Sequence, residues 1–97
     1  MSKYRRAAKI DSNQPMIVAA LRKIPGVEVQ VGMDDILVGH NGKTYWFEIK
    51  EPETVSKKTG KVRESKIKDS QKALLKNWTG HYAVVWDICQ ILEELGI

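Results

Sequence analysis

Two acids and a lysine within residues 34–50, DDILVGHNGKTYWFEIK, have the types and spacing of a site for a divalent cation. The Asn-Gly pair at 41–42 is the strongest short signal for a two-residue hairpin turn. Such a turn places Asp35 directly opposite Glu48, with Cβ atoms about 5 Å apart, where like charges are destabilising unless something compensates them. Because side chains alternate along a strand, Lys50 lies on the same face as Glu48.

Two interpretations of this acid pair follow from the residues alone. In the first, both carboxylates lie at a solvated edge of the sheet with Lys50 as a salt-bridging neighbour, and water screens their repulsion. In the second, a divalent cation bridges them. Mg²⁺ prefers hard oxygen ligands at about 2.1 Å and is typically held by one or two carboxylates, with water and phosphate oxygens completing its shell.

Hydrophobic periodicity predicts the elements that carry this hairpin. Capping residues and a proline in the first turn predict a helix that begins within residues 11–15 and ends at Pro25-Gly26. Strict alternation predicts a strand at 27–31, and the hairpin strands occupy 35–39 and 43–50. The side chains expected in the core are Ile17, Leu21, Ile24, Val27, Val29, Val31, Ile36, Val38, Tyr45, Phe47 and Ile49.

The chain changes character after the hairpin. Residues 51–68 contain Pro, Gly, Ser and six basic residues with little apolar pattern, which predicts a flexible basic loop. A helix is predicted at 69–78, a strand buried on both faces at 82–86, and a short helix from a capping pair at Asp87 to Leu95. The predicted order is therefore α-β-β-β-α-β-α. The stripe expected to face the core from the middle helix is Gln71, Leu74, Leu75 and Trp78, and Trp86 is also assigned to the core.

Composition limits the class of protein. The 97 residues, 42% apolar and 29% charged, suit one small domain. The single cysteine, Cys89, excludes an internal disulfide, and His40 and His81 are expected at the surface without the spacing of a zinc site. No stretch approaches the roughly 20 apolar residues of a membrane span, so we expect a cytoplasmic protein. A formal charge of +4 suits a polyanionic partner.

The stretch GMDDILVGHNGKTYWFEIK, residues 32–50, resembles the core of the PD-(D/E)XK nucleases. Asp35 stands at the acidic position, and residues 48–50, Glu-Ile-Lys, form the E-x-K element after the hairpin. More narrowly, the chain is similar to the small stand-alone VRR-NUC domains of phage and prophage genes. In that family a Gly-x-Pro-Asp-type turn leads into E-x-K, and a helix that begins near a glutamine follows, as at Gln71 here.

This resemblance implies a restriction-endonuclease-like α/β fold, a three-layer αβββαβ(α) arrangement with a mixed, mainly antiparallel sheet. It also implies that Asp35, Glu48 and the backbone carbonyl of Ile49 hold one or two Mg²⁺ or Mn²⁺ ions, which polarise a scissile phosphate and activate a water. Lys50 would position or deprotonate that water, and Gln71 would reach the active site. Without the resemblance, Gln71 is equally suited to capping its own helix.

Two positions depart from the family pattern. Asp34 stands where proline is usual before the acid, and Gln14 aligns with a glutamate that the first helix of many relatives supplies to the metal. Gln14 could bind through its amide oxygen or through water, or Asp11 could take its place. Trp46 shares the face of the acids and could stack on a base, although packing is the favoured role for an aromatic residue in the middle of a strand.

Basic residues are expected to contact DNA phosphates beside this site. Residues 1–10 are a basic arm, for which a solubilising tail is an equal alternative. The loop at 51–68 directly follows the E-x-K strand, and its alternative is a solvated linker. The candidates for DNA binding are Arg5, Arg6, Lys57, Lys58, Lys61, Arg63, Lys66 and Lys68.

The resemblance implies a Mg²⁺- or Mn²⁺-dependent endonuclease that cleaves structured DNA, a Holliday junction or flap, in phage recombination or replication-repair inside a bacterial host cell. Two symmetric cuts need two sites, so a homodimer is expected. No membrane partner or small-molecule cofactor is expected. The alternative is a non-catalytic nucleic-acid-binding module on the same fold, which Gln14 in place of glutamate keeps open.

Overall fold

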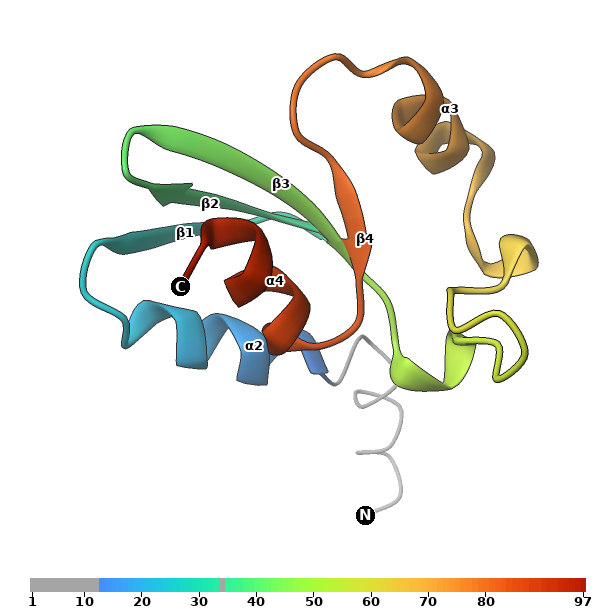
Figure 1. Cartoon of the computed structure of the whole chain (residues 1–97), viewed down its shortest axis with the longest axis horizontal. Coiled ribbons are helices and arrows are strands. Elements are labelled where there is room, and N and C mark those ends of the chain that lie inside the picture. The colour runs from blue at the N-terminus through green and yellow to red at the C-terminus, as the bar shows by residue number, and fades with distance from the viewer. Residues whose placement is uncertain (1–12, 34) are drawn as a thin grey trace.

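The computed structural model describes residues 13–33 and 35–97, which form a mixed α/β structure (Figure 1). The order of helices and strands predicted from periodicity is confirmed. In chain order the elements are α2 (Asn13–Arg22), β1 (Val27–Val31), β2 (Asp35–His40), β3 (Lys43–Ile49), two 3₁₀ turns (Pro52–Thr54 and Glu64–Lys66), α3 (Asp69–Asn77), β4 (Ala83–Val85) and α4 (Ile88–Leu95).

The four strands form one mixed sheet in the order β1-β2-β3-β4. β1, β2 and β3 are antiparallel neighbours, and β4 runs parallel to β3. Asn41 and Gly42 form the predicted turn with φ of 52° and 77°, the left-handed region that both central residues of a type I′ turn require. This turn sets the register in which Asp35 pairs with Glu48, as the sequence predicted.

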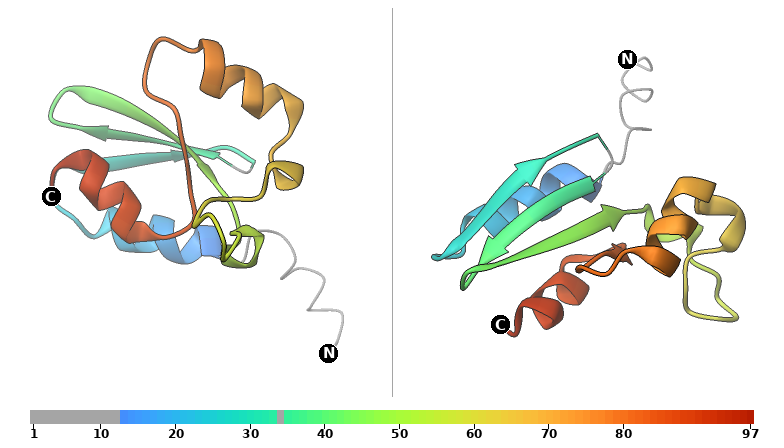
Figure 2. Two further views of the ribbon diagram at one scale, coloured as in Figure 1. Left: turned by 45° about the vertical axis from the view of Figure 1, so that its right-hand side comes forward. Right: turned by 90° about the horizontal axis from the view of Figure 1, so that it is seen from above.

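Helices α2 and α4 contact each other and share one core with the sheet, whereas α3 lies apart from both of them (Figures 1 and 2). Leu21 from α2, Phe47 from β3 and Ile91 from α4 are fully buried in this core. Asp35 and Glu48 alternate with the core residues of β2 and β3, so they lie on the face of the sheet away from α2 and α4.

Most of the core predicted for the first half of the chain is confirmed, with Val31 as the exception. Ile17, Leu21, Val27 and Val29 are buried as predicted. Val31 is 49% exposed because it is the last residue of β1, a strand at the edge of the sheet, and lines an open surface cavity beside α2. Alternation alone does not show where the covering helix stops.

Residues 51–68 contain local structure that their composition did not predict. Val55 and Val62 form an isolated antiparallel bridge, closed by a hydrogen bond of 2.8 Å from the Ser56 N–H to the carbonyl of Lys61. Val62 is buried, and Gly60 takes a left-handed φ of 71° inside the turn. Two isolated valines do not form a hydrophobic pattern with a helix or strand period, so the sequence predicted only a loop here.

The prediction for α3 is partly wrong. The helix forms over Asp69–Asn77, but only Gln71 of the expected stripe is buried, while Leu75 and Trp78 are 48% and 51% exposed. The helix lies apart from the core that α2 and α4 cover, so apolar spacing here does not mean burial. β4 is also shorter than the strand predicted at 82–86, since it spans only Ala83–Val85, and Val85 is its only buried residue. Trp86 is half-buried, outside the main core.

The capping pair predicted for the last helix is confirmed. The N–H of Gln90 donates to Asp87 Oδ1 over 3.2 Å, and the Gln90 side chain accepts from the N–H of Asp87. The helix ends at Gly96, whose φ of 80° is a left-handed cap. Within the described residues, no helix is long and apolar enough to cross a membrane.

Candidate active site

The centre of the candidate site is the Asp35–Glu48 pair of the β2–β3 hairpin. Asp35 is half-buried, but Glu48 is only 5% exposed. The interpretation of two solvated carboxylates is therefore wrong for Glu48, since water has little access to screen its charge. Burying an ionised carboxylate is costly unless hydrogen bonds, an opposite charge or a metal ion compensate it. A buried acid opposite a second acid is the arrangement that a cation stabilises.

Trp46 holds the carboxylate of Asp35. Its indole Nε1–H donates to Asp35 Oδ2 over 2.9 Å. The indole ring also meets Trp78 and Tyr82 edge to face, with centroids 5.4 Å and 4.8 Å apart. Packing is therefore the main role of the ring, as the sequence favoured, but the hydrogen bond to Asp35 was not predicted. The assignment of Trp78 to the core is wrong, since half of its surface meets solvent.

Gly32 makes room for the other carboxylate oxygen. Its N–H donates to the main-chain oxygen of Asp35 over 2.8 Å, which closes the turn between β1 and β2. An ideal Cβ built on Gly32 would overlap Asp35 Oδ1. The need for glycine here is steric, because Gly32 is not among the glycines with positive φ.

Tyr82 brings a second polar aromatic residue to the site. Its hydroxyl oxygen is buried, and burial raises the pKa of Tyr82 far above its usual value, with further contributions from the negative charges of Glu48 and Asp35. The phenol is therefore neutral at any physiological pH. A neutral hydroxyl near two carboxylates adds no third negative charge to the site.

Lys50 directly follows β3, one residue beyond the end of the strand, and its main chain is hydrogen-bonded on both sides. Its N–H donates to the carbonyl of Val85 over 2.9 Å, and its carbonyl accepts from Asn13 Nδ2 over 2.9 Å. Lys50 is half-buried, and alternation places its side chain on the face of Glu48. The side chain of Ile49 is 1% exposed in the core, so only its main chain can contribute to a ligand site.

The start of α2 lies at the same end of the sheet as these residues. Asn13 reaches Lys50, and Gln14 lines a surface cavity together with Val31 and Met33, which flank Gly32. Gln14 is only 7% exposed, and within the described chain its buried Oε1 has no hydrogen-bond partner. An amide oxygen in that state is a fitting acceptor for a cation or for a water bound to one.

Gln71 serves its own helix. Its Oε1 accepts from the N–H of Lys68 over 3.0 Å, which is the capping role that the sequence left open. The amide oxygen is therefore engaged at the start of α3. The active-site role that the family resemblance implies for Gln71 is untested by this contact.

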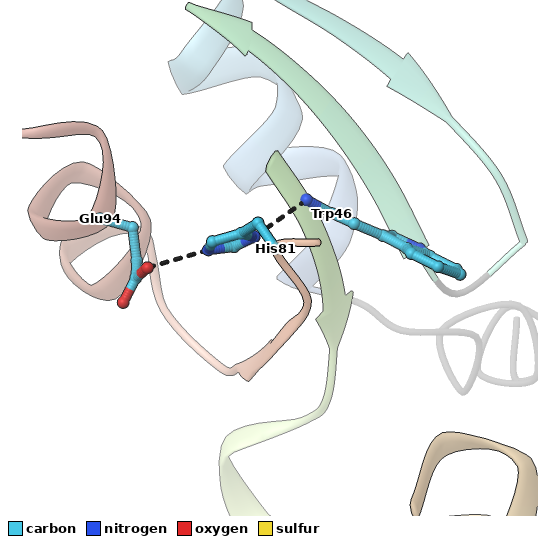
Figure 3. Close-up of polar contacts among 3 residues, drawn as sticks. All are labelled: Trp46, His81 and Glu94. Atoms are coloured by element: carbon cyan, nitrogen blue, oxygen red, sulfur yellow. Dashed lines mark hydrogen bonds and ion pairs between the residues drawn. The ribbon is translucent and has the colours of Figure 1, made fainter. Parts of the chain in front are cut away.

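His81 is not the free surface residue that the sequence predicted (Figure 3). Its Nδ1 accepts from the backbone N–H of Trp46 over 3.2 Å, and its Nε2 lies 2.9 Å from Glu94 Oε1. The ring packs edge to face on Tyr45 and Phe47, each with centroids 5.0 Å away. His81 thus extends the pairing of β3 beyond the start of β4. His40 is half-buried, with Nδ1 3.3 Å from the carbonyl of Gly26.

The basic residues predicted to bind DNA divide into two groups. Arg5 and Arg6 lie outside the described residues, as do Asp11 and Asp34. The remaining six side chains are all exposed, namely Lys57, Lys58, Lys61, Arg63, Lys66 and Lys68. Arg63 also donates to the main-chain oxygen of Glu53 over 3.2 Å.

Over residues 13–33 and 35–97, no three His, Cys, Asp or Glu side chains gather into a metal-binding group. A cation at this site would therefore depend on two carboxylates together with amide or main-chain oxygens. Comparisons of the chain with models of known protein families, with curated proteins and with solved structures found no match. The proposal for the function therefore rests on the geometry of the site and on the resemblance of residues 32–50 to the PD-(D/E)XK nucleases.

The roles of three residues of the site were not predicted from the sequence. Tyr82 lay within the strand predicted at 82–86, where period two puts it on the same face as Val84, the partner of Glu48, but no role in the site was assigned to it. The sequence placed Trp46 on the correct face of the sheet. Its hydrogen bond to Asp35 could not be predicted, because that contact depends on the distance between the two side chains across the strands. Gly32 had no signal apart from its position in the turn before the acid.

Proposed function

We propose that the protein is a metal-dependent endonuclease of the PD-(D/E)XK type, similar to stand-alone VRR-NUC domains, with a restriction-endonuclease-like three-layer fold. The observation that carries this proposal is the buried Glu48 placed directly opposite Asp35 across a tight hairpin. The order of elements and the antiparallel β1–β2–β3 pairing with a parallel β4 support the fold. The mainly antiparallel, mixed sheet is the type that the resemblance implies.

One observation at the acid pair and one at the start of α2, at the same end of the sheet, fit a divalent cation. Gly32 leaves space for Asp35 Oδ1, and the buried amide oxygen of Gln14 has no hydrogen-bond partner in the described part of the chain. Asp35, Glu48, the carbonyl of Ile49 and Gln14 would hold one or two Mg²⁺ or Mn²⁺ ions through oxygen alone, the donor set that these hard cations prefer. A bound ion supplies Lewis-acid polarisation of the phosphate and lowers the pKa of a water.

The other residues of the site would position the attacking water and limit the access of bulk water to the acids. Lys50, directly after β3, positions the attacking water and offsets the negative charge that develops on the phosphate. Trp46 and Tyr82, whose rings meet edge to face, would help to exclude bulk water from the acids, of which Glu48 is only 5% exposed. Electrostatic interactions act more strongly when water is excluded.

The partner that we propose is branched or flap DNA. Six exposed cationic side chains follow β3 in residues 57–68, and the formal charge of the chain is +4. Contacts from these side chains to phosphates would add affinity without sequence preference. Paired cuts in a branched DNA need two copies of the site, so we propose a homodimer as the active form.

A second candidate function is a nucleic-acid-binding module that does not cut. It is favoured by one observation: among the described residues no third acidic side chain joins Asp35 and Glu48 in a metal-binding group. The charged surface would serve this function equally well.

The decisive experiment uses labelled Holliday junction, flap and linear duplex DNA, each incubated with Mg²⁺ or with EDTA. The endonuclease cuts the branched substrates in Mg²⁺ only. Glu48→Gln should abolish cutting, whereas Glu28→Gln, which changes an exposed acid of β1, should leave it intact. Binding without strand scission on every DNA would establish the second candidate instead.

A further inference from the structure

The carboxylate of Asp35 is contacted from two sides by Trp46 and Gly32, neither of which has a side chain that can bind a metal. We propose that Trp46 and Gly32 are positioning residues, which hold Asp35 so that Oδ2 is engaged by the protein and Oδ1 is presented to the cation. This inference rests on the proposed function, because it assigns these two residues to the same metal site. It concerns the residues around the ligand, not the ligand set itself.

The sheet places Trp46 where its indole can reach Asp35. Asp35 pairs with Glu48 and Leu37 pairs with Trp46, so Trp46 is the diagonal neighbour of Asp35 on the same face. Diagonal neighbours are about 7–8 Å apart, within reach of a long aromatic side chain. The indole nitrogen covers that span and donates to Oδ2 over 2.9 Å.

An indole is suited to this task because its nitrogen only donates. It orients a carboxylate without competing for the cation. A hydrogen bond to an ionised acceptor is also roughly twice as strong as one between neutral groups. The edge-to-face contacts with Trp78 and Tyr82 restrain the ring, so the donor is held in place before any ligand arrives.

Gly32 acts by leaving space. The turn brings its Cα under the Asp35 side chain, and the hydrogen bond between its N–H and the Asp35 carbonyl fixes this approach. Any side chain at residue 32 would overlap Oδ1 and would push the carboxylate away from its present position. Among the described residues Trp46 is the only side chain that donates to this carboxylate, so Oδ1 is left for a ligand.

The consequence for metal binding can be measured without catalysis. Groups that orient a metal ligand typically change metal affinity by about 10–100-fold when they are removed. Mn²⁺ affinity, measured by calorimetry or by electron paramagnetic resonance of free Mn²⁺, should fall by that factor in Trp46→Phe, which keeps an aromatic ring but removes the donor. Gly32→Ala should show a similar decrease.

Trp86→Phe is the matched control, because it alters a half-buried tryptophan that lies outside the cluster of Trp46, Trp78 and Tyr82 and makes no side-chain hydrogen bond to Asp35. The Mn²⁺ affinity of this control should stay within about twofold of the wild type, well below the roughly 10–100-fold decrease expected for Trp46→Phe. Metal-free thermal melts show whether each variant folds, and Trp46→Phe carries the test should Gly32→Ala fail to fold. An unchanged Mn²⁺ affinity in a folded Trp46→Phe would overturn the proposal.

A second measurement separates this inference from the proposed function. In ¹H–¹⁵N spectra of the metal-free protein, the indole N–H signal that Trp46→Phe removes should be the one that moves most in Asp35→Asn. If no indole signal responds, the hydrogen bond is absent and the inference is wrong. If that signal responds but the wild type binds no Mn²⁺, the orienting contact stands while the metal site, and with it the nuclease, is refuted.

Discussion

Asp35 and Glu48 stand directly opposite each other across the β2–β3 hairpin, and Glu48 is only 5% exposed. Such a pair is costly in the metal-free protein, because like charges directly opposite each other repel and burial limits the screening of Glu48 by water. A site of this kind sacrifices some stability of the metal-free protein for the ability to bind a cation. Substitutions at the pair should therefore change stability and metal binding in opposite directions.

Replacing Glu48 tests both sides of this balance. Glu48→Gln should lower cleavage by at least about 1,000-fold, which corresponds to the several kcal/mol that metal coordination contributes to the transition state. The same change removes a like-charge contact, so the metal-free protein should gain about 0.2–1 kcal/mol. Single-turnover cleavage and thermal melts without metal measure the two effects. Full cleavage in this variant would place the chemistry elsewhere.

Lys50 should affect chemistry more than binding. Lys50→Ala removes the group that handles the attacking water, so cleavage should fall by about 100–10,000-fold, the range for proton-transfer groups. Mn²⁺ affinity and DNA retention should change little, because the carboxylates remain. Lys43→Ala, an exposed lysine at the other end of β3, is the control. Equal decreases in the two variants would argue for a general effect of charge.

The cationic segment after β3 should determine the salt dependence of DNA binding. The triple variant Lys57→Ala, Lys58→Ala and Lys61→Ala should reduce the slope of log affinity against log salt by up to about 0.9 for each phosphate that is no longer neutralised. Titrations of fluorescent duplex DNA over a range of salt concentrations measure this slope. Lys23→Ala, which removes an exposed charge just after α2, serves as the comparison. A slope that the triple variant leaves unchanged would exclude this segment from the interface.

The raised pKa of Tyr82 leads us to expect that the folded protein loses stability at alkaline pH. Its raised pKa means that the folded protein keeps the phenol proton at a pH where the unfolded chain, with a pKa of about 10, is already deprotonated. Its contribution is therefore fully present below about pH 10 and is lost as pH rises above that value toward the folded pKa. Chemical denaturation between pH 8 and 11 should show a steeper decline in the wild type than in Tyr82→Phe. A parallel decline in both would contradict the assignment.

His81 should be structural. His81→Ala removes the acceptor of the Trp46 N–H and the ring that packs on Tyr45 and Phe47, so stability should fall by about 1–3 kcal/mol. Glu94→Gln retains an acceptor for the exposed side of the imidazole and should cost less than about 1 kcal/mol. Urea unfolding of the two variants gives both values. A larger effect of Glu94→Gln would show that the contact with Glu94, and not the packing of the ring, holds His81 in place.

Local rules predicted the hairpin well. The Asn-Gly turn allows only one close pairing of the strands beside it, so the register of Asp35 and Glu48 followed from a dipeptide. The strand at 27–31, the capping pair at Asp87 and the order of elements were predictable for the same reason. Each depends on residues that lie close together along the chain.

Predictions that needed the position of one element relative to another were less successful. Leu75 and Trp78 have the spacing of a buried stripe, yet they are about half exposed because α3 lies apart from the main core. Val31 alternates with buried valines but ends an edge strand. His81 was predicted to lie at the surface, but it accepts a hydrogen bond from the Trp46 N–H of β3, a contact that depends on the position of β3 beside it.

The sequence by itself determined which residues of the hairpin face each other, because backbone geometry and side-chain alternation act over a few residues. Only the tertiary structure decided that Glu48 is buried, that Trp46 donates to Asp35, and that a Cβ at Gly32 would overlap Asp35 Oδ1. Burial and hydrogen bonding depend on which groups from distant elements fill the space around an atom. That space forms only when the sheet, the turns and the helices pack together. The periodicity of one segment therefore cannot predict it.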